Sequence, residues 1–154
     1  MTDPASVPTF SLAMTVAFSI ALLGSVLLKF WLATRQIHHV AQHRSAVPAA
    51  FADRITLDAH QKAADYTIAQ GRLGLLELAW GTAVTLAWTL LGALSELNQA
   101  LAHWMAPGIA QQVALLAAFA VVNAVIDLPF TLYRTFVLEQ RFGFNKTTVS
   151  LWLK

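Results

Sequence analysis

The chain has 154 residues, of which 57% are hydrophobic and only 12% are charged, whereas a soluble globular domain has roughly 25% charged residues. Its formal net charge is +2 and it has no cysteine, which excludes a disulfide framework and a thiolate metal site. No basic run is interleaved with aromatic residues, so we expect no nucleic-acid partner, and long uncharged runs predict an all-α membrane protein.

Residues 4–28 carry no charge and exceed the roughly 20 residues that cross the hydrocarbon core of a bilayer. They predict a first membrane span over about residues 10–31, with Trp31 at the interface. A cleaved signal peptide is the alternative, but it would begin with positive charge and have a shorter apolar stretch. This N-terminus carries Asp3 and neither lysine nor arginine, which favours an uncleaved span.

Residues 34–56 are polar and predict a segment at the membrane surface. Thr56 or Asp58 is expected to cap a new juxtamembrane helix, in which Asp58 and Lys62 have the i,i+4 spacing of a stabilising pair. We expect this helix to run directly into a second span over about residues 74–95.

A short connector is expected over residues 96–106, and Pro107-Gly108 then predicts the start of a third span over about residues 108–128. Alanines recur every four residues in the second and third spans, and such small residues let helices approach closely in lipid. The helical pattern continues beyond Asp127. We therefore expect the third helix to leave the bilayer and project into the aqueous compartment.

The basic residues fall into two regions, one between the first and second spans and one after the third. None precedes the first span or separates the second from the third. Three crossings place both regions on one side, which the positive-inside rule makes cytoplasmic, with the N-terminus outside. The residues are Lys29, Arg35, Arg44, Arg54, Lys62 and Arg72 in the first region, and Arg134, Arg141, Lys146 and Lys154 in the second.

Residues 127–148 read Asp-Leu-Pro-Phe-Thr-Leu-Tyr-Arg-Thr-Phe-Val-Leu-Glu-Gln-Arg-Phe-Gly-Phe-Asn-Lys-Thr-Thr. This stretch resembles the signature before the catalytic part of the type 1 CAAX prenyl proteases, which are integral-membrane zinc metalloendopeptidases. Upstream, Arg35-Gln36, Val47-Pro48, Phe51 and His60-Gln-Lys-Ala-Ala-Asp-Tyr66 are similar to the family's segment between its first two membrane helices. The candidate structural or functional residues are Asp127, Pro129, Tyr133, Glu139, Gly143, Phe144 and Asn145.

The resemblance implies that residues 1–154 are the N-terminal membrane domain of such an enzyme, forming chamber wall and docking the catalytic half. In the family, zinc is held by two histidines of a His-Glu-x-x-His motif and by a further glutamate. That motif is absent here, so we expect no catalytic residue, no metal ligand and no cofactor in this chain. The implied partners are the lipid bilayer, the C-terminal catalytic region and a prenylated or membrane peptide substrate.

A self-contained three-span scaffold or partner-binding subunit is the alternative function, although it leaves the signature unexplained. The last residues, 149–154, begin another apolar helix, so we expect the chain to be part of a longer protein. Its alanine-rich composition favours the bacterial inner membrane, and a eukaryotic source would mean the endoplasmic reticulum membrane.

His39 and His43 have the i,i+4 spacing of a helical zinc site, but Val40 stands where a metallopeptidase has its glutamate base. We therefore expect a solvated helix bearing histidines. Ionisable groups near membrane spans often mark cavities. For Asp127 a cavity and a plain interfacial position both remain open, and Glu139 is expected to pair with a basic-side arginine.

The arginines considered as partners of Glu139 are Arg35 and Arg72. Asn145-Lys-Thr147 matches an N-glycosylation sequon, but its predicted cytoplasmic position argues against glycosylation.

Overall fold

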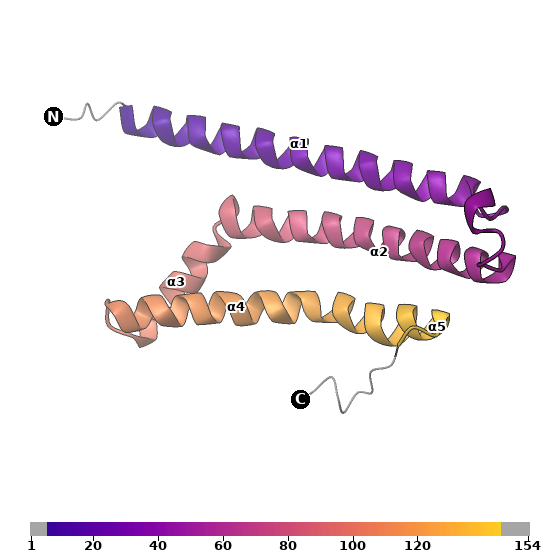
Figure 1. Cartoon of the computed structure of the whole chain (residues 1–154). Helices are drawn as coiled ribbons and strands as arrows, with labels where there is room; N and C mark the ends of the chain where they lie inside the picture. The colour runs from indigo at the N-terminus through magenta and orange to yellow at the C-terminus, as the bar shows by residue number, and fades with distance from the viewer. Residues whose placement is uncertain (1–5, 146–154) are drawn as a thin grey trace.

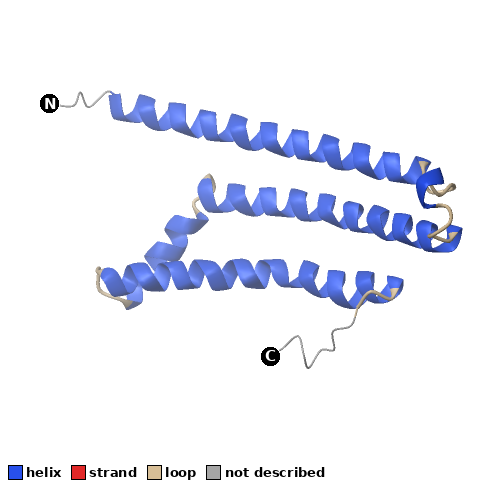
Figure 2. Cartoon of the chain, viewed as in Figure 1, coloured by secondary structure: helices blue, strands red, loops and turns tan. Residues whose placement is uncertain are grey.

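The computed structural model describes residues 6–145, and within this range it consists of helices and turns without a strand (Figure 2). The predicted all-α class is confirmed. Three long helical arms run antiparallel, with the second between the first and the third (Figure 1). The elements in chain order are α1 (Ser6–Gln42), η1 (Ala49–Phe51), α2 (Leu57–Thr89), α3 (Ala93–Trp104), α4 (Ile109–Leu132), η2 (Tyr133–Glu139) and α5 (Gln140–Phe142).

The first helix continues well beyond the predicted span and includes the first part of the segment expected to be merely polar. Its sequence contains no proline after residue 8, so nothing breaks the backbone hydrogen bonding before the turn at 43–48. Large apolar side chains such as Leu12, Ile20 and Leu27 are more than half exposed. Such outward apolar surface suits a helix surrounded by lipid.

The predicted cap and continuity of the second helix are confirmed. Thr56 Oγ1 accepts a hydrogen bond from the Ala59 amide at 3.3 Å, and α2 runs unbroken from the surface segment into the uncharged stretch. The expected pair of Asp58 and Lys62 is not among the ion pairs of the described residues. Instead, Lys62 Nζ lies 5.7 Å from the ring centroid of Phe144, which offers a cation–π contact.

The second helix ends before the last residues of the predicted second span. Helix α2 ends at Thr89, and Gly92 adopts a φ of +82°, a left-handed conformation that glycine takes at little steric cost. The expected connector is instead helix α3, bent by 55° from α2. By length and composition, α1 and the long helix over 109–142 each suffice to cross a membrane, and α2 with α3 makes a third crossing if the bent pair counts as one.

The third helical arm begins one residue after its predicted start and continues without a break to Phe142, as expected. Pro129 lies inside it, where it cannot donate a backbone hydrogen bond. Shortly afterwards the helix widens into the π-helical turns of η2. Whether this end projects from the bilayer stays a prediction.

Two polar contacts join the helices at the end of the bundle opposite the basic residues. Trp88 Nε1 donates to Asn123 Oδ1 at 3.2 Å, joining α2 to α4. Gln111, which is buried, donates from Nε2 to Asn98 Oδ1 at 3.3 Å, joining α4 to α3. Side-chain hydrogen bonds of this kind hold membrane helices together where apolar burial supplies no driving force.

Helix α1 packs closely against α2 at Gly71. A Cβ atom at Gly71 would lie 2.7 Å from Ile37 Cγ1, whereas one at Gly74 would meet nothing within 4 Å. We predict that Gly71→Ala lowers the free energy of unfolding in detergent by about 1–2 kcal/mol, because Ile37 must shift. Gly74→Ala, the matched control, should raise it by about 0.5–1 kcal/mol through helix propensity.

The same Gly71→Ala change in an Ile37→Ala background should cost little, because the overlapping atoms are gone. An equal loss in both backgrounds, measured by chemical unfolding, would contradict this helix contact.

Candidate functional site

The residues of the signature stretch, 127–145, lie along the half of α2 that precedes its uncharged run. We call residues 127–145 the signature segment. Its contacts with α2 include an ion pair at one end and an aromatic cluster at the other. A groove separates these two contacts.

The ion pair joins Arg134 of η2 to Glu77 of α2, with Nη2 and Oε2 2.5 Å apart. The two side chains are 42% and 28% exposed, so both are partly withdrawn from solvent. The Nε atom of Arg134 is buried and has no hydrogen-bond partner among residues 6–145. The guanidinium is therefore held between the helices with donor capacity to spare.

The ion pair expected for Glu139 is not among those of the described residues. Among the described residues, neither Arg35 nor Arg72 forms an ion pair with Glu139. The sequence does contain a signal for the ion pair between Glu77 and Arg134. Glu77 directly precedes one uncharged run, and Arg134 follows another. Charges at such positions lie at the same depth in an antiparallel pair of spans.

Asp127 lies beside this ion pair. A pocket of about 280 Å³ is lined by Asp127, Glu77 and Arg134, together with Trp80, Phe130 and Thr131. Asp127 lines this pocket, and the two interpretations of it, a cavity and a plain interfacial position, both stay predictions. Two acids and one arginine give this pocket a polar wall at the edge of the uncharged zone.

The aromatic cluster fixes the other end of the signature segment. The ring of Tyr66 meets the rings of Phe142 and Phe144 edge-on, with centroid distances of 5.5 and 4.8 Å. Between these two phenylalanines, Gly143 has a φ of +73°, which turns the chain back so that both rings reach Tyr66. Lys62 covers the outer face of Phe144.

The helix end is closed through the backbone of Glu139. Its carbonyl accepts hydrogen bonds from the amides of Phe144 at 2.9 Å and Asn145 at 3.2 Å. Glu139 and Asn145 therefore hold the turn around Gly143 together. This contact assigns Glu139 a structural position that does not depend on its carboxylate.

The π-helical turns decide which side chains face α2. A π-helix has wider turns than an α-helix, so residues four apart stay closer to one face. Arg134, Leu138 and Phe142 are spaced in this way, and all three meet α2 or the groove beside it. Leu138 is 5% exposed and is among the few buried residues of the described chain.

The groove between the two contacts has a volume of about 550 Å³. Its apolar wall includes Leu73, Leu76 and Leu138, and Pro129 and Tyr133 of the signature segment also line it. Two basic side chains, Arg72 from α2 and Arg141 from α5, complete the lining.

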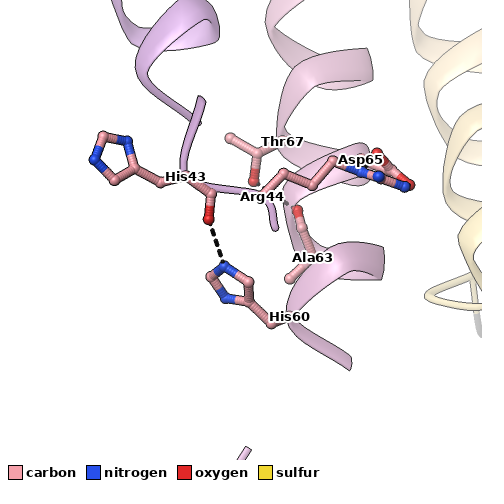
Figure 3. Close-up of polar contacts among 6 residues, drawn as sticks. All are labelled: His43, Arg44, His60, Ala63, Asp65 and Thr67. Atoms are coloured by element: carbon pink, nitrogen blue, oxygen red, sulfur yellow. Dashed lines mark hydrogen bonds and ion pairs between the residues drawn. The ribbon is translucent and has the colours of Figure 1, made fainter. Parts of the chain in front are cut away.

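A second polar cluster ties the loop after α1 to α2 (Figure 3). Arg44 donates through Nε and Nη2 to the two carboxylate oxygens of Asp65, at 2.6 and 2.8 Å. This hydrogen bonding lowers the pKa of Asp65 below its ordinary value. Burial opposes the shift, and the charges of Arg44 and Arg141 add to the lowering. His60 Nε2 lies 3.0 Å from the carbonyl oxygen of His43.

Both basic regions therefore meet at one end of the three helical arms, since the charges of Arg44 and Arg141 act on the same carboxylate, that of Asp65. The side of the membrane that this end faces stays a prediction.

The histidine pair does not form a metal site with neighbouring residues. The rings of His39 and His43 stack with centroids 4.2 Å apart, and His43 Nδ1 is hydrogen-bonded to the His39 carbonyl. Within residues 6–145, no group of three or more His, Cys, Asp or Glu side chains could hold a metal ion. The donor set present here does not fit the zinc that the resemblance implies. The sequon at Asn145 extends into residues outside the described range.

Comparison with known proteins relates the sequence to one family. The family described as CAAX prenyl protease N-terminal, with five membrane helices, matches residues 36–154. CAAX prenyl protease 1 of Saccharomyces cerevisiae is 28% identical over 135 residues, covering 80% of this chain and 29% of that protein. Probable CAAX prenyl protease 1 of Schizosaccharomyces pombe is 26% identical over 161 residues, covering 96% of this chain and 33% of that protein.

The fold has a counterpart among solved structures. The crystal structure of Ste24p from S. mikatae superposes with a TM-score of 0.76 at 24% identity, covering 86% of this chain and 32% of that one. These three matches cover most of this chain. The chain, however, spans only about a third of the length of each of these relatives.

We predict that Glu77 and Arg134 stabilise the fold jointly. In a double-mutant cycle of Glu77→Gln and Arg134→Gln, the coupling free energy should be about 1 kcal/mol, reduced by partial exposure from what a buried pair would give. Glu96 and Arg35, at opposite ends of the helical bundle, serve as the control pair, and the effects of their substitutions on stability should be additive. Chemical unfolding in detergent measures both cycles, and zero coupling for the first pair would contradict the contact.

The contact between Arg44 and Asp65 should make stability depend on pH. Because the pKa of Asp65 is lowered in the folded state, its contribution is present above the unfolded value of about 4 and is lost as pH falls through the folded value. Asp65→Asn should therefore unfold at a lower temperature than the parent chain at pH 7, and this difference should shrink progressively as the pH falls below about 4. Asp53→Asn, in the exposed loop, is the control; a pH-independent difference for Asp65→Asn would contradict the prediction.

Proposed function

The chain belongs to the CAAX prenyl protease N-terminal family, and from this membership we propose that it is the membrane-embedded N-terminal part of a zinc metalloendopeptidase. In this role it forms part of a chamber wall and docks the catalytic half, and it does not catalyse by itself. The observation that carries the proposal is the signature segment, which is already held along α2 by the ion pair and the aromatic cluster.

Docking requires a rigid presentation of the residues that lead into the rest of the enzyme. The turn at Gly143 is fixed from two sides, by the Glu139 carbonyl and by Tyr66. The chain is therefore held in a defined position as far as Asn145. This supports a structural role for Gly143, Phe144 and Asn145, and a wall-forming role for Pro129 and Tyr133 beside the groove.

The proposed membrane arrangement is three crossings with the N-terminus outside and the basic end in the cytoplasm. The second crossing consists of α2 and the bent helix α3. The clustering of Arg44, Arg134 and Arg141 near one end supports this arrangement, because lysine and arginine are enriched on the cytoplasmic side. Membership of the family makes the chain part of a multi-pass membrane protein.

The proposed substrates are prenylated peptides of the CAAX type, after the activity named for the relatives. Zinc and the groups that activate water would come from a region outside the described residues, since the donor set here does not fit the metal. A bacterial inner membrane, or the endoplasmic reticulum membrane of a eukaryote, is the proposed location. The alternative of a self-contained scaffold is not favoured, because it does not account for the family match over residues 36–154.

The first test is to extend the reading frame beyond Lys154 and to compare both forms of the protein. We predict a His-Glu-x-x-His motif downstream, with zinc binding and hydrolysis of a prenylated peptide by the long form and neither by residues 1–154. Stoichiometric zinc in the short form would overturn the noncatalytic role.

A variant of the long form tests docking separately. Gly143→Val places a β-branched residue at a positive φ and should lower peptide hydrolysis about tenfold or more while zinc content is retained. Gly74→Ala, whose new Cβ meets nothing within 4 Å, is the control. Full activity of Gly143→Val would contradict the docking role of this turn.

A further inference from the structure

The groove between α2 and the signature segment combines an apolar wall with two cationic residues. Leu73, Leu76 and Phe130 belong to the apolar wall. Arg72 and Arg141 also line the groove. Neither arginine forms an ion pair with another residue of the described chain.

The charged residues around this groove indicate its depth in the membrane. The uncharged runs 78–95 and 109–126 end at Glu77 and Asp127, so these two residues mark the edge of the hydrocarbon core. At 1.5 Å per residue, the run 109–126 is about 27 Å long, close to the roughly 30 Å of that core. The groove begins at this edge. Arg72 lies five residues beyond Glu77, or about 7.5 Å along the helix, which places this part of the groove at the level of lipid headgroups.

The lining of the groove is positively charged, because it contains Arg72 and Arg141 and no acidic residue. Asp65, a carboxylate on which the charge of Arg141 acts, accepts hydrogen bonds from Nε and Nη2 of Arg44 and is thereby neutralised. Glu77 is neutralised in the same way by Arg134. Arg72 and Arg141 remain as two cations above an apolar wall. A phosphate diester with an attached acyl chain has the complementary arrangement of charge and apolar surface.

We propose that this groove binds one anionic phospholipid of the basic-side leaflet, with the phosphate at Arg72 and Arg141 and an acyl chain along Leu73 and Leu76. The side chain of Leu76 is 64% exposed, and Tyr133 is 49% exposed, so lipid can enter from the membrane. The lipid would join α2 to the end of the signature segment and so support the turn that docks the rest of the enzyme. The binding site itself requires only the membrane placement and does not rest on the proposed proteolysis.

Spin-labelled lipids test this site in the 154-residue chain. The chain is placed in phosphatidylcholine vesicles with trace spin-labelled phosphatidylglycerol or phosphatidylcholine, and the motionally restricted fraction gives the relative association. We expect phosphatidylglycerol to be preferred, with the preference falling about fivefold for Arg72→Gln or Arg141→Gln and vanishing in the double variant. Arg54→Gln, which removes the same charge from the neighbouring loop, should leave the preference unchanged.

A charge-neutral variant separates the groove from general surface charge. Leu76→Trp keeps both arginines but fills the apolar part, and it should remove the restricted phosphatidylglycerol component. Circular dichroism checks that every variant keeps its helix content. No preference in the parent chain, or an equal loss in Arg54→Gln and Arg72→Gln, would overturn the proposal. Neither result bears on the proposed catalytic assignment, which is tested separately by peptide hydrolysis in the long form.

Discussion

The exclusion of charge from hydrocarbon governs how this chain is arranged. An ionised side chain at the centre of a bilayer is costly, so charges gather where a helix meets the headgroups or pair with one another. Here the uncharged runs of α2 and α4 end at Glu77 and Asp127, which line the same pocket. Arg134 completes that pocket and pairs with Glu77. Depth in the membrane therefore fixes the register of α2 against α4 before any detailed packing is considered.

Within the uncharged zone the helices are joined by few but specific contacts. Asn123 would be an unsatisfied amide in lipid, but it accepts from Trp88 and also donates to the Phe119 carbonyl at 2.7 Å. The described chain has little buried apolar surface, with only Ala64, Leu73 and Leu138 in its hydrophobic core. Polar pairing, close approach at Gly71 and the aromatic contacts of Tyr66 take the place of a soluble protein's core. This is the construction expected of a membrane domain whose exposed faces meet lipid or further helices.

Much of this architecture was predictable because charge and capping signals are local in sequence. The run 109–126, the Thr56 cap and the joint placement of the basic regions could all be inferred from residue type and spacing. The bend at Gly92 was missed because an apolar run conceals a helix end when its glycine is flanked by leucine and alanine. The partner of Arg134 was missed because it depends on two helices meeting at one depth. The π-helical turns of η2, which turn Leu138 toward α2, leave no simple periodic signal. The groove likewise arises only when α2 and α5 are brought together.

The arrangement of the three arms across a membrane can be measured most directly by cysteine accessibility, because the chain contains no native cysteine. Single cysteines at Ala52, Ala100 and Gln140, all exposed, report on the two ends of the layer. In sealed, oriented membrane vesicles, an impermeant maleimide should label positions 52 and 140 from the same side and position 100 only from the other. Labelling of positions 52 and 140 from opposite sides, or of all three from one side, would contradict the three-crossing account.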